Sequence, residues 1–358
     1  MARLSGMRVL VAGAGAVGSV LALRLQDEGA QVVLADPASL GKNASGVAAG
    51  MLAPAFEAAL DPLSAGHFKL LKTARDMWPE LAARLSGFGA GLDLSAALWV
   101  GDEASNAAML GRLTGLGAQA ERLDAAAAER LSPGLRAPHG AVCTSEDWTL
   151  QPLQMLGALR AAFEAVGGVI RPSAVRRWRS GEAVLADGEV VRADVLVLAT
   201  GFAADGMEQA PPELGALAPI KGQLARIETA APVSGPVVRG EGVYLAPRAS
   251  GPVVGATMEA GARDIEINAA AVARLKTVSA GLFPGLAMAA AIGAAGVRAS
   301  TPDGLPLVGP SRTPGVRLAV GARRNGWLLA PMIAEVIADQ LAGDSGGRWG
   351  RLFDPARF

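Results

Sequence analysis

Cysteine, histidine and net charge are nearly absent from this 358-residue sequence, and each absence excludes a class of protein. The single cysteine, Cys143, excludes an intrachain disulfide framework and a cluster of cysteine metal ligands. The two histidines, His67 and His139, are not spaced as in a metal motif such as HExxH. Thirty-three basic residues balance 33 acidic ones, so no net field would attract nucleic acid or an anionic membrane. We therefore expect no metal, no nucleic-acid partner and no membrane partner.

Strongly lipophilic runs are also missing. Residues 277–297 carry no charge and are nominally long enough to span a bilayer. Pro284 would break a helix there, so we expect a helix, a turn and a strand instead. Residues 9–23 look like the core of a signal peptide, but a nucleotide-binding unit explains them more specifically. The expected localisation is therefore cytoplasmic.

The pentapeptide GDSGG at 343–347 formally matches the GxSxG motif of serine hydrolases. It lies beyond the last expected helix, and no strand or histidine follows that would activate the serine. We interpret it as a C-terminal turn.

The first 36 residues have the pattern of a dinucleotide-binding unit. Residues 7–12 predict a buried strand, GAGAVG follows at 13–18, and apolar residues then recur at helical spacing until Gly29. Residues 31–35 predict a second strand, which ends at Asp36. This succession of strand, glycine turn, helix, strand and acid is typical of dinucleotide-binding units, and it makes the match more specific than GxGxxG alone. The alternative is a glycine-rich unit that binds nothing.

Each position of the glycine turn has a physical role in this prediction. Gly13 permits the tight turn, Gly15 lets the backbone approach a pyrophosphate, and Gly18 lets the helix pack closely on the strand. The backbone N–H groups at the start of the helix, at Ala16 and Val17, would bind the phosphates.

The residues after the second strand bear on the choice of dinucleotide. Asp36 would accept hydrogen bonds from the ribose hydroxyls and would repel a 2′-phosphate. Pro37 beside it supplies no cation, which disfavours NADP. The motif alone leaves NAD and FAD open.

Further blocks follow along nearly the whole chain. They are NASGVAAGMLAP at 43–54, DWTLQP at 147–152, DVLVLATG at 194–201, VYLAPR at 243–248, VVGATME at 253–259, TPDGLPLVG at 301–309 and RNGWLLAP at 324–331. Taken alone, the first block is also compatible with an ordinary Ala/Gly loop. In this order, the blocks resemble the D-amino-acid oxidase family of flavoproteins and, within it, most closely the glycine oxidases of the thiamine pathway.

The resemblance implies that the cofactor is non-covalently bound FAD. In that family the small-residue loop runs along the flavin, where bulky side chains would collide with the ring system. The residues of this loop that would bind FAD are Ala44, Ser45, Ala49, Gly50 and Met51.

Two later segments complete the implied cofactor site. The backbone at Val175 would touch the adenosine part of FAD, and Thr200 and Gly201 would form the family's second glycine turn. Main-chain N–H groups near the start of the C-terminal helix would stabilise negative charge on the flavin during reduction. The residues of this last segment are Arg324, Asn325, Gly326, Trp327 and Leu328.

The resemblance also implies a carboxylate-binding site for the substrate. Arg298 matches the family's carboxylate-binding arginine, and Tyr244, the chain's only tyrosine, matches its substrate-contacting phenol. Arg324 would contact the carbonyl side of the substrate, and Met51 and Met258 would line the pocket. Structural roles stay open as alternatives. The tyrosine could pack on a sheet, Arg298 could be a surface residue, and the two methionines could belong to the core. No residue is expected to act as an acid or base, because flavin accepts the hydride.

One departure from the family's pattern lies just before Arg324. Glycine oxidases commonly have a histidine and then an aromatic residue there, and this chain has Ala322 and Arg323. We expect the change to bear on substrate preference or oxygen reactivity and not on the fold.

The length is sufficient for two packed units, and the resemblance divides the chain between them. We expect an α/β fold with a Rossmann-like, doubly wound FAD-binding domain over residues 1–80, 144–213 and 298–358. An interleaved α+β substrate domain with an antiparallel sheet would take residues 81–143 and 214–297.

The implied reaction is oxidative deamination of glycine or a similar small amino acid to glyoxylate or its counterpart, ammonia and hydrogen peroxide. The partners would be this amino acid and oxygen, the imine would feed thiamine thiazole synthesis, and a homo-oligomer is compatible with the family. Alternatives are a D-amino-acid or sarcosine-type N-methyl amine dehydrogenase or oxidase, a silent flavin-binding subunit and, more distantly, an NAD-dependent dehydrogenase.

Overall fold

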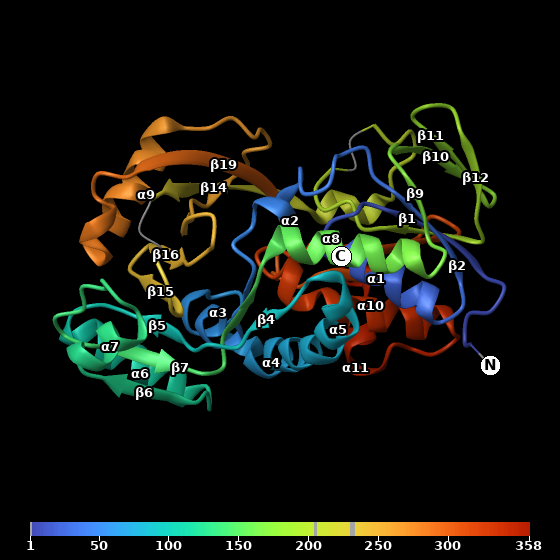
Figure 1. Cartoon of the computed structure of the whole chain (residues 1–358). Coiled ribbons are helices and arrows are strands. Elements are labelled where there is room, and N and C mark those ends of the chain that lie inside the picture. The colour runs from blue at the N-terminus through green and yellow to red at the C-terminus, as the bar shows by residue number, and fades with distance from the viewer. Residues whose placement is uncertain (1, 204–205, 230–232) are drawn as a thin grey trace.

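The computed structural model describes residues 2–203, 206–229 and 233–358. Two regions lie side by side in Figure 1, one built on the parallel sheet that contains β1 and β2, the other on the sheet that contains β14 to β19. The chain crosses between the regions several times, so each sheet combines segments that are distant in the sequence.

The first region contains a six-stranded sheet in the order β20-β21-β13-β1-β2-β9. All neighbouring pairs are parallel except β20 and β21. The strands are β1 (Arg8–Ala12), β2 (Gln31–Ala35), β9 (Val169–Arg171), β13 (Val195–Leu198), β20 (Leu307–Pro310) and β21 (Val316–Val320). The predicted α/β fold with a parallel nucleotide-binding sheet is confirmed.

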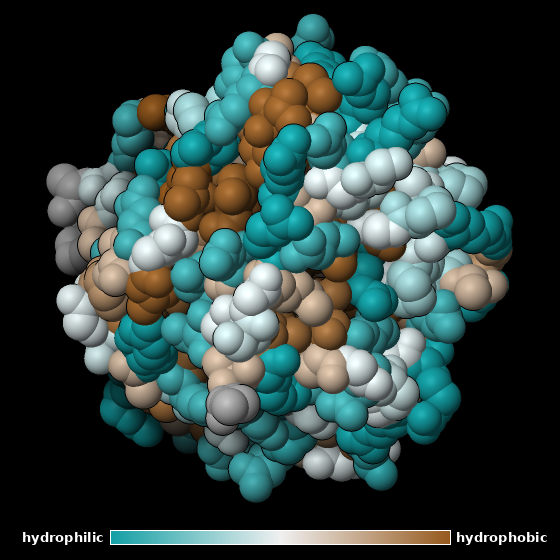
Figure 2. All heavy atoms as spheres, turned by 90° about the vertical axis from the view of Figure 1, so that its right-hand side faces the viewer, coloured by the Kyte–Doolittle hydropathy of each residue, from teal (hydrophilic) through white to brown (hydrophobic). Residues whose placement is uncertain are grey.

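Both faces of this sheet are covered, which explains why β1 is apolar at consecutive positions. Val9 and Val11 face a core shared with the helices α1 (Ala16–Asp27), α8 (Pro152–Ala165) and α10 (Gly326–Leu341). Leu10 and Ala12 point the other way, into a core under a three-stranded antiparallel sheet. That sheet consists of β10 (Val175–Arg179), β11 (Glu182–Leu185) and β12 (Val190–Arg192). The outer face that Figure 2 shows is mostly hydrophilic, with smaller apolar patches.

The second region contains a nine-stranded sheet in the order β18-β14-β17-β16-β15-β5-β7-β6, with β19 also paired to β14. β14 and β19 pair with each other in antiparallel orientation along eleven residue pairs. The strands are β5 (Ala97–Trp99), β6 (Ala120–Leu123), β7 (Ala141–Thr144), β14 (Ala218–Glu228), β15 (Val237–Gly240), β16 (Val243–Ala246), β17 (Val253–Gly255), β18 (Glu259–Ala260) and β19 (Ala290–Ser300). The residue boundaries given above for the two domains stay a prediction.

The remaining elements connect the two regions or cover their edges. A small antiparallel sheet is formed by β3 (Met51–Leu52), β8 (Trp148–Leu150) and β4 (Leu92–Asp93). The other helices are α2 (Ala44–Val47), α3 (Pro54–Leu60), α4 (Phe68–Asp76), α5 (Trp78–Leu85), α6 (Glu103–Gly115), α7 (Ala125–Leu131), α9 (Ala269–Leu282) and α11 (Gly347–Leu352).

The uncharged segment 277–297 has the predicted structure. Helix α9 ends at Leu282, Pro284 begins a short 3-10 turn, and β19 starts at Ala290. Among the described residues, no helix is long and apolar enough to cross a membrane. The GDSGG segment is not beyond the last helix as expected, because it links α10 to α11.

Candidate active site

The glycine turn after β1 is shaped by close backbone contacts. Gly13 has a left-handed φ of +105°, which side chains rarely adopt. A Cβ at Gly18 would collide with the carbonyl oxygen of Gly13, so α1 can approach the strand only because glycine occupies this position. Gly15 precedes α1 and brings no capping side chain, although the Ser45 hydroxyl accepts the N–H of Ala16 at the start of the helix. The turn therefore leaves the remaining N–H groups at the positive end of the α1 dipole available to an anion.

The predicted nucleotide residues gather around this turn. Asp36, which follows β2, accepts hydrogen bonds from the backbone N–H groups of Ala14 at 2.6 Å and Ala38 at 2.7 Å. Thr200 follows β13, and its hydroxyl oxygen is buried without a hydrogen-bond partner in the structure. Val175 begins β10 and packs on the core that contains Ala12. An orphaned hydroxyl beside a glycine turn fits a bound dinucleotide, which would supply the missing polar partner.

The small-residue loop lies where the two regions meet. The Ser45 hydroxyl accepts the N–H of Ala16 at the start of α1, at 2.9 Å. Trp327 at the start of α10 donates its indole N–H to the Ser45 carbonyl oxygen at 3.1 Å. The guanidinium of Arg248, in the loop after β16, donates to the carbonyl oxygen of Ala49. These contacts place the loop between the glycine turn, the C-terminal helix and the large sheet.

The start of α10 faces the same space. Arg324 and Asn325 line the cavity described below, and no side chain caps this helix N-terminus. Trp327 and Leu328 are buried in the helical core instead, with the Trp327 ring 6.0 Å from that of Trp78. Only the backbone of these two residues is therefore placed to serve a cofactor. The groups predicted to surround FAD are near one another, although their individual roles stay predictions.

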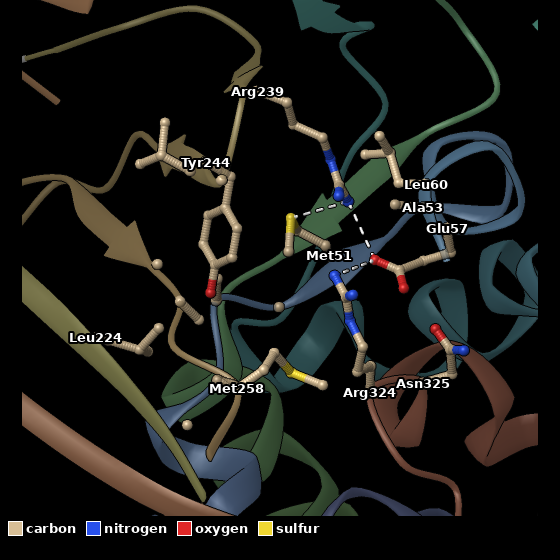
Figure 3. Close-up of a pocket in the computed structure, with 18 of the residues that line it drawn as sticks. Met51, Ala53, Glu57, Leu60, Leu224, Arg239, Tyr244, Met258, Arg324 and Asn325 are labelled. Atoms are coloured by element: carbon tan, nitrogen blue, oxygen red, sulfur yellow. Dashed lines mark hydrogen bonds and ion pairs between the residues drawn. The ribbon is translucent and has the colours of Figure 1, made fainter. Parts of the chain in front are cut away.

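A cavity of about 660 Å³ lies between the loop and the large sheet. All five residues predicted to bind substrate line it, although they come from four separate segments of the chain. They are Met51, Tyr244, Met258, Arg298 and Arg324. Figure 3 shows Tyr244 on one side of the cavity and Arg324 on the other, with Met51 and Met258 between them.

Two glycines in the sheet make room for the Tyr244 ring and the Arg298 guanidinium. Tyr244 on β16 pairs with Gly255 on β17, and a Cβ at Gly255 would collide with the Tyr244 ring and hydroxyl. A Cβ at Gly222 on β14 would collide with the guanidinium of Arg298 on β19. The two glycines thus let both polar groups lie against the sheet and reach the cavity.

Arg298 has no carboxylate of a described residue within ion-pair distance. Its one hydrogen-bond contact is from Nη1 to the Met258 sulfur, at 3.6 Å. Burial lowers the pKa of this guanidinium, and the charge of Arg324 lowers it further. Burial also raises the pKa of Tyr244, so the phenol keeps its proton at neutral pH. The two side chains offer an unpaired cation and a hydroxyl donor to a carboxylate.

The sequence prediction missed several cavity residues, among them the buried pair Glu57 and Arg239. Glu57 Oε1 lies 3.1 Å from Nη2 of Arg324 and 3.5 Å from Nη2 of Arg239, as the dashed lines in Figure 3 show. Glu57 is the one charged residue between Lys42 and Asp61, a signal that could have identified it. Arg239 precedes Tyr244 across a tight β-hairpin, and hairpin register would have placed the two side by side.

At positions 322 and 323, where the chain departs from the pattern of glycine oxidases, the added positive charge of Arg323 is balanced by a nearby carboxylate. Arg323 has a left-handed φ of +50° and forms an ion pair with Asp61, whose side chain is buried. Arg323 does not line the cavity, and Asp61 balances its charge. The expected effect on substrate preference or oxygen reactivity stays a prediction.

Known proteins match this chain along nearly its full length. The DAO family model, described as FAD dependent oxidoreductase, matches residues 8–340. Glycine oxidase from Pseudomonas putida is 28% identical over 98% of this chain and 97% of its own length. The solved glycine oxidase from Geobacillus kaustophilus has a TM-score of 0.85 at 24% identity, covering 98% of this chain and 99% of that one. Iminodiacetate oxidase from Chelativorans sp. BNC1 has a TM-score of 0.82 at 26% identity, with 94% and 96% covered.

Proposed function

Because the chain belongs to the DAO family of FAD-dependent oxidoreductases, we propose that it oxidises glycine or a similarly small amino acid. The products are the 2-oxo acid, which is glyoxylate for glycine, ammonia and hydrogen peroxide, with oxygen as the acceptor. The observation that carries the proposal is the unpaired Arg298 guanidinium beside the Tyr244 hydroxyl in one cavity. The glycine oxidase from Pseudomonas putida, similar along its whole length, supports the substrate class.

The protein's own residues would bind and orient the substrate. When bound, FAD supplies the hydride acceptor and the group that reacts with oxygen. Arg298 would hold the substrate carboxylate with two parallel N–H donors, and Tyr244 would donate a third hydrogen bond. Fixing one carboxylate in this way orients the α-carbon, and orientation is a large part of catalysis when no acid or base is needed.

The charge of the cavity would also prepare the substrate amine. A hydride can leave the α-carbon readily only when the amine is neutral. Four arginines line the cavity against two glutamates, which leaves an excess of positive charge; the residues are Arg112, Arg239, Arg298 and Arg324 against Glu57 and Glu241. Nearby positive charges lower the pKa of a substrate ammonium group and favour its loss of a proton to water.

The residues that would hold FAD follow from the geometry of the first region. Gly13, Gly15 and the start of α1 would bind the pyrophosphate, and Asp36 would bind the ribose. The loop at 44–51 and the start of α10 would take the flavin. The backbone N–H groups at Asn325 and Gly326 would stabilise negative charge on the reduced ring.

An anaerobic absorbance titration with glycine, followed by air, tests this function. The yellow protein should bleach with glycine, recover its absorbance in air and release hydrogen peroxide. A yellow protein that stays oxidised with glycine and other small amino acids would contradict the proposal. Failure of purified protein to retain or take up FAD would contradict the cofactor assignment.

Two alternatives give different results in the same experiment. A dehydrogenase for D-amino acids or N-methyl amines such as sarcosine would turn over with phenazine dyes but release little peroxide. A silent flavin-binding subunit would not bleach with any amine. The family match argues against the NAD-dependent dehydrogenase, which would purify colourless.

Four predictions concern the cellular role of the enzyme and its partners. The imine product would supply thiazole synthesis for thiamine. The enzyme would work in the cytoplasm, without a nucleic-acid partner, and a homo-oligomer would agree with the family resemblance.

A further inference from the structure

The end of the cavity opposite Arg298 carries a second arginine, Arg239, to which the proposed function assigns no contact with the substrate. Arg239 lies on β15, paired with Trp99 on β5 and with Tyr244 on β16. Cross-strand partners point to the same face of a sheet, so Arg239 stands beside the tyrosine that would bind the substrate. In Figure 3 its guanidinium points into the cavity, toward Met51 and Glu57.

Arg239 is buried, with only 3% of its surface exposed, yet its hydrogen bonds are incompletely satisfied. Its Nε has no hydrogen-bond partner, and its Nη2 lies 3.5 Å from Glu57 and 3.3 Å from the Met51 sulfur. Glu57 is closer to Arg324, at 3.1 Å, and its second oxygen has no partner. A buried guanidinium has five N–H donors to satisfy, and one shared carboxylate at the limit of hydrogen-bond distance leaves most of them free.

Neighbouring carboxylates do not remove this deficit. Asp147 lies behind Arg239, but it accepts hydrogen bonds from the N–H groups of Ala55 and Phe56 and makes none to Arg239. At the rim, the exposed Arg112 and Glu241 have opposite charges and offset each other. Among the described residues, Glu57 is thus the one carboxylate within hydrogen-bond distance of Arg239, and it is shared with Arg324. A substrate carboxylate held by Arg298 would leave the Nε of Arg239 without an acceptor.

The cavity is also large for a small amino acid. Glycine has five heavy atoms and needs roughly the space of two or three water molecules, at about 30 Å³ each. The cavity measures about 660 Å³ and extends from Arg298 and the flavin-facing loop to Trp99 and Arg239. Its lining continues past Tyr244 to the neighbouring strands β15 and β5, where Arg239 would meet a substrate longer than glycine.

We infer that the substrate is an amino acid with a second carboxylate, which Arg239 binds while Arg298 and Tyr244 hold the first. This inference rests on the proposed function and specifies its substrate class. The second carboxylate has two chemical sources, an N-carboxymethyl group on the amine or an acidic side chain on the α-carbon. Both place an anion a few bonds from the reacting carbon.

Binding of unreactive dicarboxylates tests the inference without turnover. Diglycolate and methoxyacetate have similar ether backbones, lack an amine, and differ in the second carboxylate. Perturbation of the flavin spectrum of the holoenzyme gives a Kd for each. Diglycolate should bind about 10- to 100-fold more tightly, as expected for one buried charged hydrogen-bonded contact. Equal affinities would overturn the inference.

Variants then assign the effect to Arg239. In Arg239→Gln, the ratio of the two Kd values should approach one, whatever happens to the affinity for methoxyacetate. Arg239→Lys, which keeps the charge but loses the planar donor pair, should retain part of the preference. Arg112→Gln at the rim is the matched control and should keep the wild-type ratio. If Arg112→Gln loses the preference for diglycolate over methoxyacetate and Arg239→Gln keeps it, the assignment to Arg239 is overturned.

Anaerobic flavin reduction separates this inference from the proposed function. N-(carboxymethyl)glycine and D-aspartate, as the two sources of a second carboxylate, are compared with sarcosine and glycine. A reduction efficiency at least 10-fold above sarcosine for either diacid supports the inference and identifies the source. If glycine and sarcosine reduce the flavin as well as both diacids do, the inference fails and the proposed function stands. If no amine reduces the flavin, the proposed function fails. The Kd values of diglycolate and methoxyacetate still show whether Arg239 binds a second carboxylate.

Discussion

The two ends of the cavity hold arginines in different electrostatic settings. Arg298 is half-buried and has no carboxylate of a described residue within ion-pair distance; its guanidinium contacts the Met258 sulfur at 3.6 Å. At the other end, the buried Arg239 shares Glu57 with Arg324, and the charge of Asp147 interacts with that of Arg239. A cation removed from water is costly to the folded protein unless an anion joins it, and a shared counter-ion removes only part of that cost. The first end thus depends on an incoming anion for its neutralisation, while the second is partly neutralised by its own residues and keeps the unsatisfied Nε of Arg239 for a ligand.

The largest expected effect is the loss of substrate binding in Arg298→Met. Removing one partner of a buried charged contact costs about 2–5 kcal/mol, so the flavin reduction efficiency with glycine should fall about 30- to 5000-fold. Stopped-flow reduction measures it. Arg226→Met, on the neighbouring strand β14 but outside the cavity, is the control and should reduce normally. An Arg298→Met enzyme with unchanged glycine affinity would disprove the carboxylate clamp.

At the other end, Glu57→Gln should affect stability more than affinity for glycine. The substitution leaves Arg239 and Arg324 without their shared counter-ion, and breaking a buried pair in this way costs on the order of 3 kcal/mol. Urea unfolding followed by tryptophan fluorescence would detect a lower midpoint. The double variant Glu57→Gln/Arg239→Gln should recover part of the loss. An unchanged midpoint in the single variant would mean that water in the cavity already screens the pair.

Asp147 should make the stability of this end depend on pH. Burial raises the pKa of Asp147 to about 6, even though Arg239 and two backbone N–H groups lower it. Because the folded protein holds this proton more tightly than the unfolded chain, stability is greatest below about pH 4 and falls as the pH rises to about 6. The whole change amounts to about 3 kcal/mol at most.

The Asp147→Asn variant isolates that contribution from the other carboxylates. The difference between wild-type and variant unfolding free energies should change between pH 4 and 6 and stay level above pH 6.5. Asp93→Asn, an exposed neighbour on β4, is the control and should reproduce the wild-type curve. Parallel wild-type and Asp147→Asn curves would show that Asp147 titrates in its ordinary range.

The smallest expected effect is that of Tyr244→Phe at the Arg298 end. The hydroxyl is proposed to donate one hydrogen bond to the substrate carboxylate, worth about 1 kcal/mol in addition to the arginine contact. The Kd for glycine should therefore rise roughly fivefold, with the unfolding midpoint little changed because the ring stays against Gly255. A larger loss, matching that of Arg298→Met, would mean that the phenol and not the guanidinium is the main clamp.

The sequence was informative where neighbours along the chain determine the structure. The glycine turn, α1 and Asp36 follow one another within 36 residues, and the structure forms them nearly where the pattern predicts. The break at Pro284 was likewise local, because proline cannot continue a helix whatever surrounds it. The segment from 169 to 179 is less local, because β9 and β10 follow each other closely along the chain but belong to different sheets.

Glu57 and Arg239 show what could not be predicted. They are 182 positions apart, and their contact depends on how α3 packs against the hairpin of β15 and β16. Asp147 assists by accepting hydrogen bonds from the first N–H groups of α3, again from a distant segment. Such pairings depend on the packing of whole elements, which periodicity and spacing do not report.

Residue types and local spacing therefore determined the nucleotide-binding unit, because they specify backbone conformation and hydrogen-bonding chemistry. The residues proposed to meet the substrate were predicted from the family resemblance and not from spacing. Only the tertiary structure decided which charges are paired. Arg298 and Arg239 have the same side chain, and their difference arises because Glu57 lies within ion-pair distance of Arg239, whereas no carboxylate of a described residue lies within that distance of Arg298.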